Sequence, residues 1–532
     1  FVAERDIRWL VRGRELLDLR DHPDIDGLVT KRLAPPKPAP GAVARSMQPF
    51  GPLVRPSLSR WGLVLLGVCV HLAGGWGLLV VMGLANRMAG RTELVGWSWL
   101  LGLALSSVTA LCWFLAGHTV TPLGPMLPHV ILAVTGGLTA WRFGPHRRPV
   151  PTGESHDSRT SRLSWLMLVM AGVVIVLAAW RGIDGFDQRM QWGFKARLMQ
   201  SEPGPWGESV FQDRDHVHFH PRYPLLVPAA EAIFGGLGGG GDAGTRGFSE
   251  SAAVMIFPLT WLALGGVVIG GLERLGSRDP VRGGILVLLM PAWSGLGAFQ
   301  NNLATFNGCP ELIVGAALLA AVVAMLSAHR EGGDWWALVG ICLLMAGLSK
   351  AEGAVAVAVL AGVALVATTT AGQRGILVPS LAVVAVVGGT LLAHELVFTR
   401  GVVGGILPDD YRELLTVAGV LDGMTRLPHV ASELAIEAVV APWFGAVGAC
   451  LVYAVWASRG RWRVPAVRWP LVTTLLMLAA YCVPFLVIPD FENNLDWAAG
   501  RLLMEVAPLA AWSLAVILDG GVAVGISGGE TG

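Results

Sequence analysis

The sequence predicts an all-α integral membrane protein, built as a bundle of about 12 to 13 transmembrane helices. Of its 532 residues, 53% are hydrophobic and only 14% are charged, whereas soluble domains carry roughly 25% charged residues. The mean hydropathy is +0.58, and apolar runs that can cross about 30 Å of hydrocarbon recur along the chain. These observations exclude a disordered chain and favour the bilayer as the solvent.

Apolar runs of membrane-crossing length predict the individual helices. They lie at 61–85, 93–117, 122–141, 164–181, 250–272, 281–299, 310–329, 335–349, 351–371, 375–397, 436–458, 467–489 and 501–519. The third run contains Pro122, Pro125 and Pro128, so whether it crosses the membrane stays open. The run 223–238 is short and ends in GGLGGGG, which predicts a helix that lies at the interface or enters the membrane only partly.

The remaining segments define the domain organisation that we expect. Residues 1–60 are polar and contain the run APPKPAP, which indicates a tail rather than a signal peptide. Additional N-terminal helices follow at 61–141, and a membrane core occupies 142–519, with 182–249 as its first outer loop. Residues 520–532 form a flexible C-terminal tail.

The distribution of lysine and arginine predicts the orientation. Basic residues collect in the short loops 142–163, 273–282 and 459–468, which should therefore face the cytoplasm. The side of the N-terminal tail, with its eleven basic residues, stays open. Counting helices from the basic loops places five polar segments on the outer side: 182–249, 300–309, the turn at 350, 398–435 and 490–500.

Charge and cysteine content exclude other classes of function. The formal net charge is +1 and no basic stripe is interleaved with aromatic residues, so we expect no nucleic-acid partner. The cysteines lie in or at the edges of apolar segments without a CxxC pair, which indicates packing residues. They are Cys69, Cys112, Cys309, Cys342, Cys450 and Cys482.

The first outer loop concentrates charge. Residues 182–222 contain eleven charged residues in 41 positions, about twice the average of the chain. Within GFDQRMQWGFKAR, a spacing of four residues places Asp187, Gln191 and Lys195 on one helical face. A solvated amphipathic helix that lies on the membrane explains this spacing equally well.

A second motif, DRDHVHFHPRYPLLVP, follows in the same loop. His216, His218 and His220 alternate and would share one face of an extended strand, where a zinc or manganese site is one interpretation and a polar surface is the other. Two prolines then fix the backbone, which should hold His220 and Tyr223 rigidly at the interface.

These two motifs resemble the first outer loop of bacterial GT-C glycosyltransferases, polytopic enzymes similar to protein mannosyltransferases and lipopolysaccharide-modifying sugar transferases. Members of this group typically contain G-W-D, then W, then K-A-K or K-A-R, and later H-P-x-Y-P. This chain keeps Asp187, Trp192, Lys195 and Arg197 of that pattern, and it has Phe186 where a tryptophan is usual.

Three further segments resemble the same family in the expected order. CPELIVGAALL opens a later helix with Glu311, and LSKAEGAVAVAVL is similar to the K-N-E-G turn with Lys350 and Glu352. LDWAAGRLLMEVAPL is similar to the late W-x-x-x-x-R-L-L motif, with Trp497 and Arg501. The resemblance covers about residues 164 to 519.

The resemblance implies a GT-C-type catalytic core in the bacterial cytoplasmic (inner) membrane, with its active site on the outer face. Because no nucleotide sugar reaches that face, the donor would be a polyprenyl-phosphate sugar. The acceptor would be a glycolipid, a polysaccharide or a small molecule, and transfer would proceed with inversion. Membrane lipid surrounds the protein in this interpretation.

The expected reaction assigns roles to the candidate residues. Asp187 is the predicted base, because a carboxylate just after a span can have a raised pKa, and Asp184 is its substitute. Lys350 and Arg501 are the predicted ligands of the donor phosphate, and Glu352 either orients Lys350 or acts as a second carboxylate near the donor. The predicted substrate-binding residues are Trp192, Lys195, Arg197, His220, Tyr223, Glu311 and Trp497.

No cofactor is predicted firmly, and a divalent metal ion remains an alternative. Its possible ligands are outer-loop acids, which can equally bind acceptor hydroxyls or simply be solvated. They are Asp409, Asp410, Asp490, Glu492 and Asp496, with Arg412 beside the first pair.

Two rival functions stay open. A transporter or flippase of lipid-linked sugars would need paired halves and a polar path near the midplane, but no internal repeat is visible. A non-catalytic envelope scaffold with a degenerate site is the second rival. The departures at Phe186 and at residues 498–500, which are Ala-Ala-Gly, leave that weaker rival open.

Overall fold

The computed structural model describes most of the chain, in two compact units, Phe1–Pro52 and Leu53–Gly532. In the first unit, strands β1 (Trp9–Arg12) and β2 (Glu15–Asp18) form an antiparallel hairpin. The described residues are 9–12, 15–18, 56–143, 158–183, 188–207, 209–213, 220–239, 247–297, 306, 308–370, 374–399, 401–402, 416–440, 442–458, 460–488 and 491–519.

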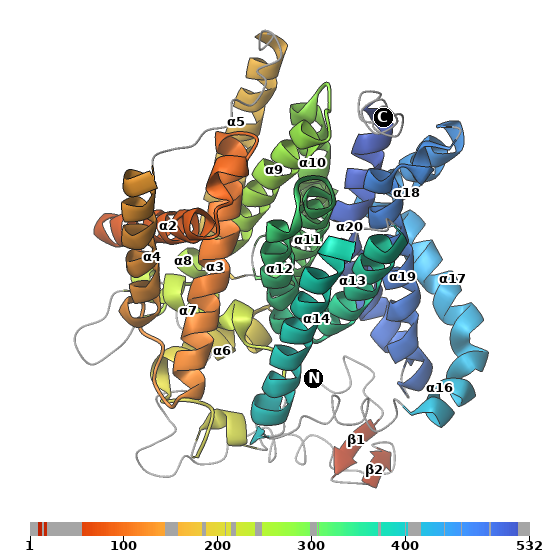
Figure 1. The fold of residues 1–532 in the computed structure, drawn as a ribbon. Helices are drawn as coiled ribbons and strands as arrows, with labels where there is room; N and C mark the ends of the chain where they lie inside the picture. The colour runs from red at the N-terminus through yellow and green to blue at the C-terminus, as the bar shows by residue number, and fades with distance from the viewer. Residues whose placement is uncertain are drawn as a thin grey trace. The chain divides into compact units, whose positions relative to one another are not determined.

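The described part of the second unit is helical, which confirms the predicted all-α class (Figure 1). Its longer helices are α2 (Leu58–Val81), α3 (Arg91–Leu115), α4 (Leu123–Phe143), α5 (Ser158–Arg181), α9 (Ile256–Arg274), α10 (Pro280–Gly297), α11 (Pro310–Glu331), α12 (Trp336–Ser349), α13 (Ala351–Thr370), α14 (Arg374–His394), α17 (Leu427–Val440), α18 (Pro442–Ala457), α19 (Pro465–Val487) and α20 (Phe491–Leu518). Shorter α-helices are α6 (Phe194–Ser201), α7 (Leu226–Gly238), α8 (Glu250–Ala253) and α16 (Val417–Gly423).

Several short turns of other helix types join these helices. The π-helices η4 (Gln188–Gly193) and η9 (Glu395–Thr399) lie next to α6 and α14. The 3₁₀ helices are η3 (Ala85–Arg87), η5 (Val210–Gln212), η8 (Gly333–Trp335), η10 (Met424–Arg426) and η11 (Arg461–Arg463).

Within the described residues, nine helices are long and apolar enough to cross a membrane, so the chain is a multi-pass membrane protein. The finer count of 12 to 13 spans stays a prediction. The nine are Leu58–Val81, Arg91–Leu115, Leu123–Arg142, Glu250–Arg274, Pro310–Glu331, Ala351–Thr369, Leu377–Thr399, Pro465–Val487 and Ala498–Leu518.

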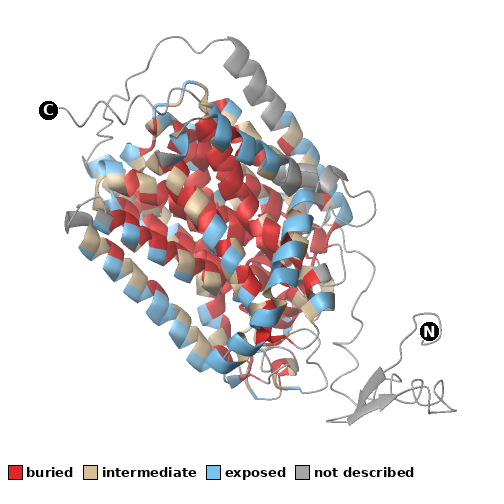
Figure 2. Ribbon diagram, turned by 90° about the vertical axis from the view of Figure 1, so that its right-hand side faces the viewer, coloured by how far each residue is buried: buried red, intermediate tan, exposed pale blue. Residues whose placement is uncertain are grey.

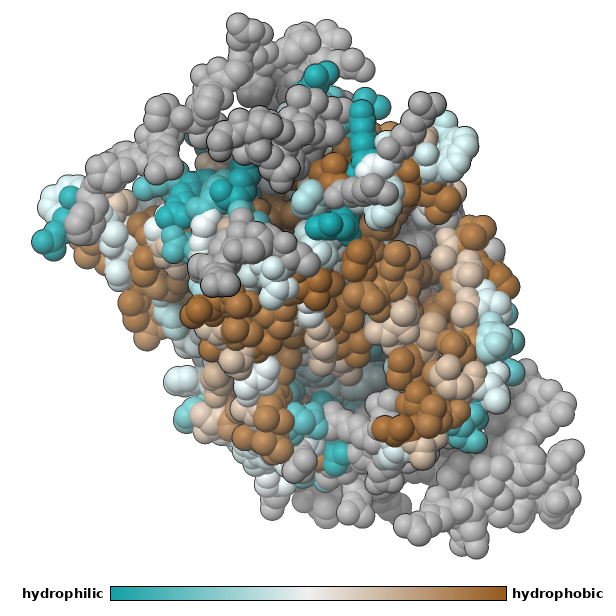
Figure 3. Space-filling model, turned by 45° about the vertical axis from the view of Figure 1, so that its right-hand side comes forward, coloured by the Kyte–Doolittle hydropathy of each residue, from teal (hydrophilic) through white to brown (hydrophobic). Residues whose placement is uncertain are grey.

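The outer surface of the bundle is apolar, as a bilayer requires. Large apolar side chains on α4 and α14 point outward, among them Ile131, Leu138, Val378 and Val386. Figure 2 shows such exposed positions on the outer helices around a buried interior, and Figure 3 shows hydrophobic atoms across the middle of one face. In water this surface would be an aggregation hazard, whereas lipid tails are as apolar as these side chains.

One predicted segment differs in detail from the structure, and two others are described more fully by it. The single helix predicted over 436–458 is wrong: α17 ends at Val440 and α18 begins at Pro442, because proline lacks the N–H that continues a helix but fits a first helical position. The run 223–238 contains the predicted helix, α7, which is buried within the protein, and its depth in the membrane stays a prediction. The proline-containing third run is one continuous helix, α4.

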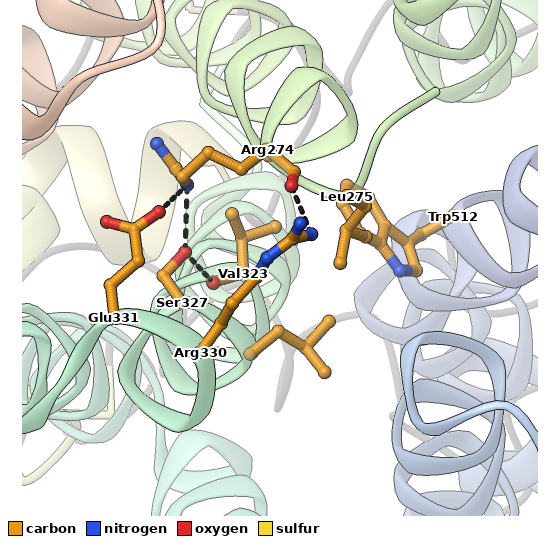
Figure 4. A pocket seen from close by; sticks show the side chains of 9 residues that line it. Arg274, Leu275, Val323, Ser327, Arg330, Glu331 and Trp512 are labelled. Atoms are coloured by element: carbon orange, nitrogen blue, oxygen red, sulfur yellow. Dashed lines mark hydrogen bonds and ion pairs between the residues drawn. The ribbon is translucent and has the colours of Figure 1, made fainter. Parts of the chain in front are cut away.

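Charged residues fasten one end of the bundle. Arg274 of α9 pairs with the fully buried Glu93 of α3, and its Nε donates to Ser327 Oγ of α11 at 3.1 Å. Figure 4 shows Arg274 and Ser327 in the lining of a pocket that also includes Arg330 and Trp512. The pocket has a volume of about 10 Å³, which holds at most one water molecule. These contacts hold α3, α9 and α11 together, and this pocket is too small for a substrate.

The predicted outer segments gather at the opposite end. In Figure 1, α6 and α16 lie at the lower end of this unit, and α18, which leads towards the basic loop, lies near the upper end. Gln212 Nε2 donates to the carbonyl of Gly401 at 2.7 Å, and Arg222 Nε donates to that of Val402 at 3.0 Å. The long loop after α5 therefore contacts the segment that follows α14.

Glycines allow α2 to approach its neighbours closely. A Cβ at Gly75 would overlap the carbonyl oxygen of Ser98 on α3, and a Cβ at Gly77 would overlap that of Leu132 on α4. Such small-residue contacts replace the hydrophobic effect as the source of helix association inside lipid. By contrast, Gly62 of the same helix has open space around it.

We therefore expect Gly75→Ala to destabilise the protein by about 1–3 kcal/mol, because the added methyl group forces α2 and α3 apart. Thermal unfolding of the purified protein in detergent measures this change. Gly62→Ala on the same helix is the matched control and should cause no loss. Equal unfolding temperatures for the two variants would contradict the close packing of α2 against α3.

Candidate functional site

A buried ion network surrounds Lys350, which lies between α12 and α13. Its Nζ lies 3.0 Å from Glu311 Oε1, 3.2 Å from Glu352 Oε1 and 3.2 Å from Glu505 Oε1. Glu311 and Glu505 are fully buried, and the side chain of Lys350 is 4% exposed. One ammonium therefore joins the start of α11, the start of α13 and the middle of α20.

Further donors bind the remaining oxygens of the two buried carboxylates, Glu311 and Glu505. Arg501 Nε lies 2.7 Å from Glu311 Oε1, and the Cys309 thiol donates to Glu311 Oε2 at 2.7 Å. The Tyr481 hydroxyl of α19 donates to Glu505 Oε2. Both carboxylates are thus bound at both oxygens, which is the condition under which buried charges are tolerated.

The charges in this network limit what it can bind. Three carboxylates (Glu311, Glu352 and Glu505) face two cations (Lys350 and Arg501). Both cations predicted to hold the donor phosphate therefore already contact carboxylates. An incoming phosphate at this place has to compete with Glu311, which weakens the predicted role of these two residues.

We expect Lys350→Met to destabilise the protein by about 3–5 kcal/mol, because it leaves buried carboxylates without their shared cation. Arg87→Met is the control, since Arg87 pairs with Asp334 at 2.6 Å on the surface and such pairs contribute less than about 1 kcal/mol. Chemical unfolding in mixed micelles compares the two variants. A loss of similar size in both would show that the Lys350 network does not hold the helices together.

A second cluster centres on Lys195 in α6. Its side chain is fully buried, and its Nζ lies 5.1 Å from the ring centroid of Trp192 and 5.3 Å from that of Tyr223. The His220 ring stacks on Tyr223, with centroids 4.8 Å apart and an angle of 18°. His220 itself has a φ of 51°, a left-handed conformation that is uncommon outside glycine and often occurs at functional sites.

Burial decides the electrostatics of Lys195. Removal from water disfavours the ammonium form and holds the pKa of Lys195 well below its ordinary value. Neither Lys195 Nζ nor the buried Trp192 Nε1 has a hydrogen-bond partner among the described residues. The alternative of a solvated amphipathic helix over 185–197 is therefore wrong for Lys195, although the predicted helical form is present from Gln188 onward.

Arg197, another predicted substrate-binding residue, is engaged elsewhere. It forms an ion pair with Glu250 at the start of α8, and Arg189 lies 3.8 Å from the other oxygen of that carboxylate. The pair ties α6 to the start of the next span. The structure thus separates Lys195 from Arg197, which the shared motif had grouped together.

The turn before α11 lies against the segment that leads to Trp192 and Lys195. A Cβ at Gly308 would lie 3.0 Å from Gln188 Cβ and 3.3 Å from Ile183 Cγ2. Gly308 has a φ of 119°, so this close approach depends on glycine. Ile183 and Gln188, the described residues on either side of the predicted bases, therefore both lie against the turn that leads to Glu311.

Several predicted residues lie outside what the structure describes. Neither predicted base is described, and for Trp497 only its place on α20 is given. Among the described residues, no three histidine, cysteine or acidic side chains come together as a metal site. The metal alternative stays a prediction, because most of its proposed ligands are undescribed. The undescribed residues are Asp184, Asp187, His216, His218, Asp409, Asp410, Arg412 and Asp490, together with the side chain of Asp496.

Sequence reasoning missed three buried polar residues. Glu505 follows Arg501 by four residues, and an acid inside an apolar run is a functional candidate by default, so it could have been found. Glu231 in α7 is likewise an acid inside an apolar run. It is fully buried, and neither carboxylate oxygen has a hydrogen-bond partner in the described part of the chain. No sequence pattern identifies Tyr481, because its contact with Glu505 depends on how α19 packs against α20.

A wide apolar groove lies between α17, α18 and α19. Its volume is about 860 Å³, which is in the range of sites for drug-sized ligands. Cys482 lines this groove, whereas the preceding residue, Tyr481, contacts the Lys350 network. Helix α19 therefore has hydrocarbon-compatible space on one side and the buried charges on the other.

Comparison with protein-family models, with curated proteins and with solved structures gives no match for this chain. The assignment of function therefore rests on the residues and their arrangement.

Proposed function

We propose that this protein is a membrane glycosyltransferase, which moves a sugar from a polyprenyl-phosphate donor to an extracytoplasmic acceptor. The acceptor is a glycolipid, a polysaccharide or a small molecule, and the reaction takes place at the outer end of the helix bundle. The GT-C family provides the expected core for this chemistry.

One observation carries the proposal. Glu311, Lys350, Glu352 and Arg501 were chosen from three separate motifs, and they meet in one buried network. The turn before this network contacts both residues that flank the predicted bases. Motifs that are spread over more than 300 residues of sequence and share one end of a bundle support a common site.

In the proposed reaction, an acceptor hydroxyl attacks the anomeric carbon of the donor sugar. Asp187 takes the hydroxyl proton as the new carbon–oxygen bond forms, and the bond between sugar and phosphate breaks. The polyprenyl phosphate leaves with the bonding electron pair, so a single displacement inverts the anomeric centre. The apolar groove along α19 offers space for a prenyl chain.

The position of these residues also bears on the two rival functions, a transporter and a non-catalytic scaffold. A transporter needs a polar path near the midplane of the membrane, whereas the Lys350 network and the Lys195 cluster include residues of the segments predicted to lie on the outer side. A non-catalytic scaffold would keep this architecture without turnover, so only an activity measurement separates it from an enzyme.

We expect Asp187→Asn to lower kcat by about 10²- to 10⁴-fold, because it removes the proposed general base. The measurement is transfer of radiolabelled sugar from polyprenyl-phosphate sugars to candidate acceptors by purified protein. Asp334→Asn is the matched control, since Asp334 is an exposed acid at the other end of α11. Equal transfer by all three proteins would remove Asp187 as the base, and no transfer from any donor would favour the scaffold.

Membrane orientation is open to a separate test in a cysteine-free background. Ser201→Cys at the end of α6 should react with a membrane-impermeant maleimide in intact cells, because α6 lies on the proposed outer side. Arg278→Cys in the basic turn after α9 should react only after permeabilisation. The reverse pattern would place the site in the cytoplasm and contradict a lipid-linked donor on the outer face.

A further inference from the structure

The cations of the Lys350 network are poor candidates for holding a substrate anion. Lys350 contacts three carboxylates, and Arg501 contacts Glu311 at 2.7 Å. In a low-dielectric interior such contacts are strong, so a phosphate would first have to displace a fixed carboxylate. The network is better suited to holding α11, α13 and α20 together.

Lys195 presents the opposite situation. It is fully buried, its neighbours within reach are the faces of Trp192 and Tyr223, and no described group accepts a hydrogen bond from Nζ. Trp192 Nε1, three residues earlier, is a second buried donor without an acceptor among the described residues. Lys195 Nζ lies 5.1 Å from the ring centroid of Trp192, so the two unused donors belong to one cluster.

Unused buried donors are costly to the folded protein, and nearly all such groups in native structures have partners. Aromatic faces attract a cation but accept no strong hydrogen bond, so they do not replace an anion. A ligand rich in acceptor oxygens and negatively charged satisfies both donors at once. Phosphate has these properties, and carbohydrate hydroxyls lack the charge.

We propose that Lys195 and Trp192 Nε1 bind the phosphate group of the lipid-linked substrate, in place of Lys350 and Arg501. This proposal rests on the proposed function. Lys195 acts as the point charge and the indole as an additional donor. The turn at Gly308, just before α11, lies against Gln188, the first residue of the π-helix that contains Trp192. The phosphate recognised here is that of a lipid headgroup or of a free phosphate, and the two are distinguished experimentally.

The test is equilibrium binding of farnesyl phosphate, farnesol and inorganic phosphate to the full-length protein in detergent. We expect the native protein to bind farnesyl phosphate at least about tenfold more tightly than farnesol. Lys195→Met should lose that preference, while its weak binding of farnesol is unchanged. Trp192→Phe keeps a ring and removes the N–H, so it should lose part of the preference. Inorganic phosphate that binds as tightly as farnesyl phosphate would overturn recognition of a lipid headgroup.

Thermal unfolding without ligand separates a binding role from a structural one. Methionine fills a similar volume and removes a buried amine that has no hydrogen-bond partner among the described residues, so Lys195→Met should unfold at an equal or higher temperature than the native protein. A lower unfolding temperature, or unchanged preference for farnesyl phosphate, would overturn the proposal. Arg87→Met, on the exposed pair with Asp334, controls for loss of a positive charge. Phosphate-dependent binding without any sugar transfer would keep this site and reject the transferase.

Discussion

The contact between Lys350 and Glu311 is the constraint on which the arrangement of the core depends. Neither charge can be left unpaired inside an apolar bundle, so the start of α11 has to meet the junction of α12 and α13. Glu505 and Arg501 extend the same requirement to α20, and the Tyr481 hydroxyl extends it to α19. A handful of polar atoms thus fixes the mutual register of helices whose apolar surfaces would pack in many ways.

The opposite end of α11 carries a matching constraint. Arg274 pairs with the buried Glu93 and donates to Ser327, close to where α11 ends. A helix of 22 residues spans roughly 33 Å, about the thickness of the hydrocarbon layer. Charged groups therefore lie at both ends of α11 and apolar contacts lie between them. The two ends differ in their surroundings: the pocket at the Arg274 end has a volume of about 10 Å³, whereas the turn before Glu311 lies against Ile183 and Gln188.

The structure also changes which of the candidate cations are suited to bind a phosphate. Lysine and arginine near a membrane surface suggest phosphate binding, but the suggestion depends on whether a carboxylate already occupies them. Lys350 and Arg501 are occupied, and Lys195 is buried between aromatic rings without a carboxylate partner among the described residues. The sequence alone does not distinguish these three basic residues. Their packing does: Lys350 and Arg501 hold the bundle together, and Lys195 is suited to an incoming anion.

The sequence by itself determined the membrane class, the approximate place of most helices and the clustering of polar segments at the two ends. These follow from local composition, because the bilayer demands long apolar runs and repels charge wherever it occurs. It also found Glu311, Lys350, Glu352 and Arg501 as individual candidates through motif resemblance. Only the tertiary structure decided which partners each charge has, that Glu505 and Tyr481 join the network, that Lys195 is buried, and that α17 and α18 are separate helices. The physical reason is that pairing and burial depend on side chains far apart in the chain, whose approach is set by the packing of whole helices.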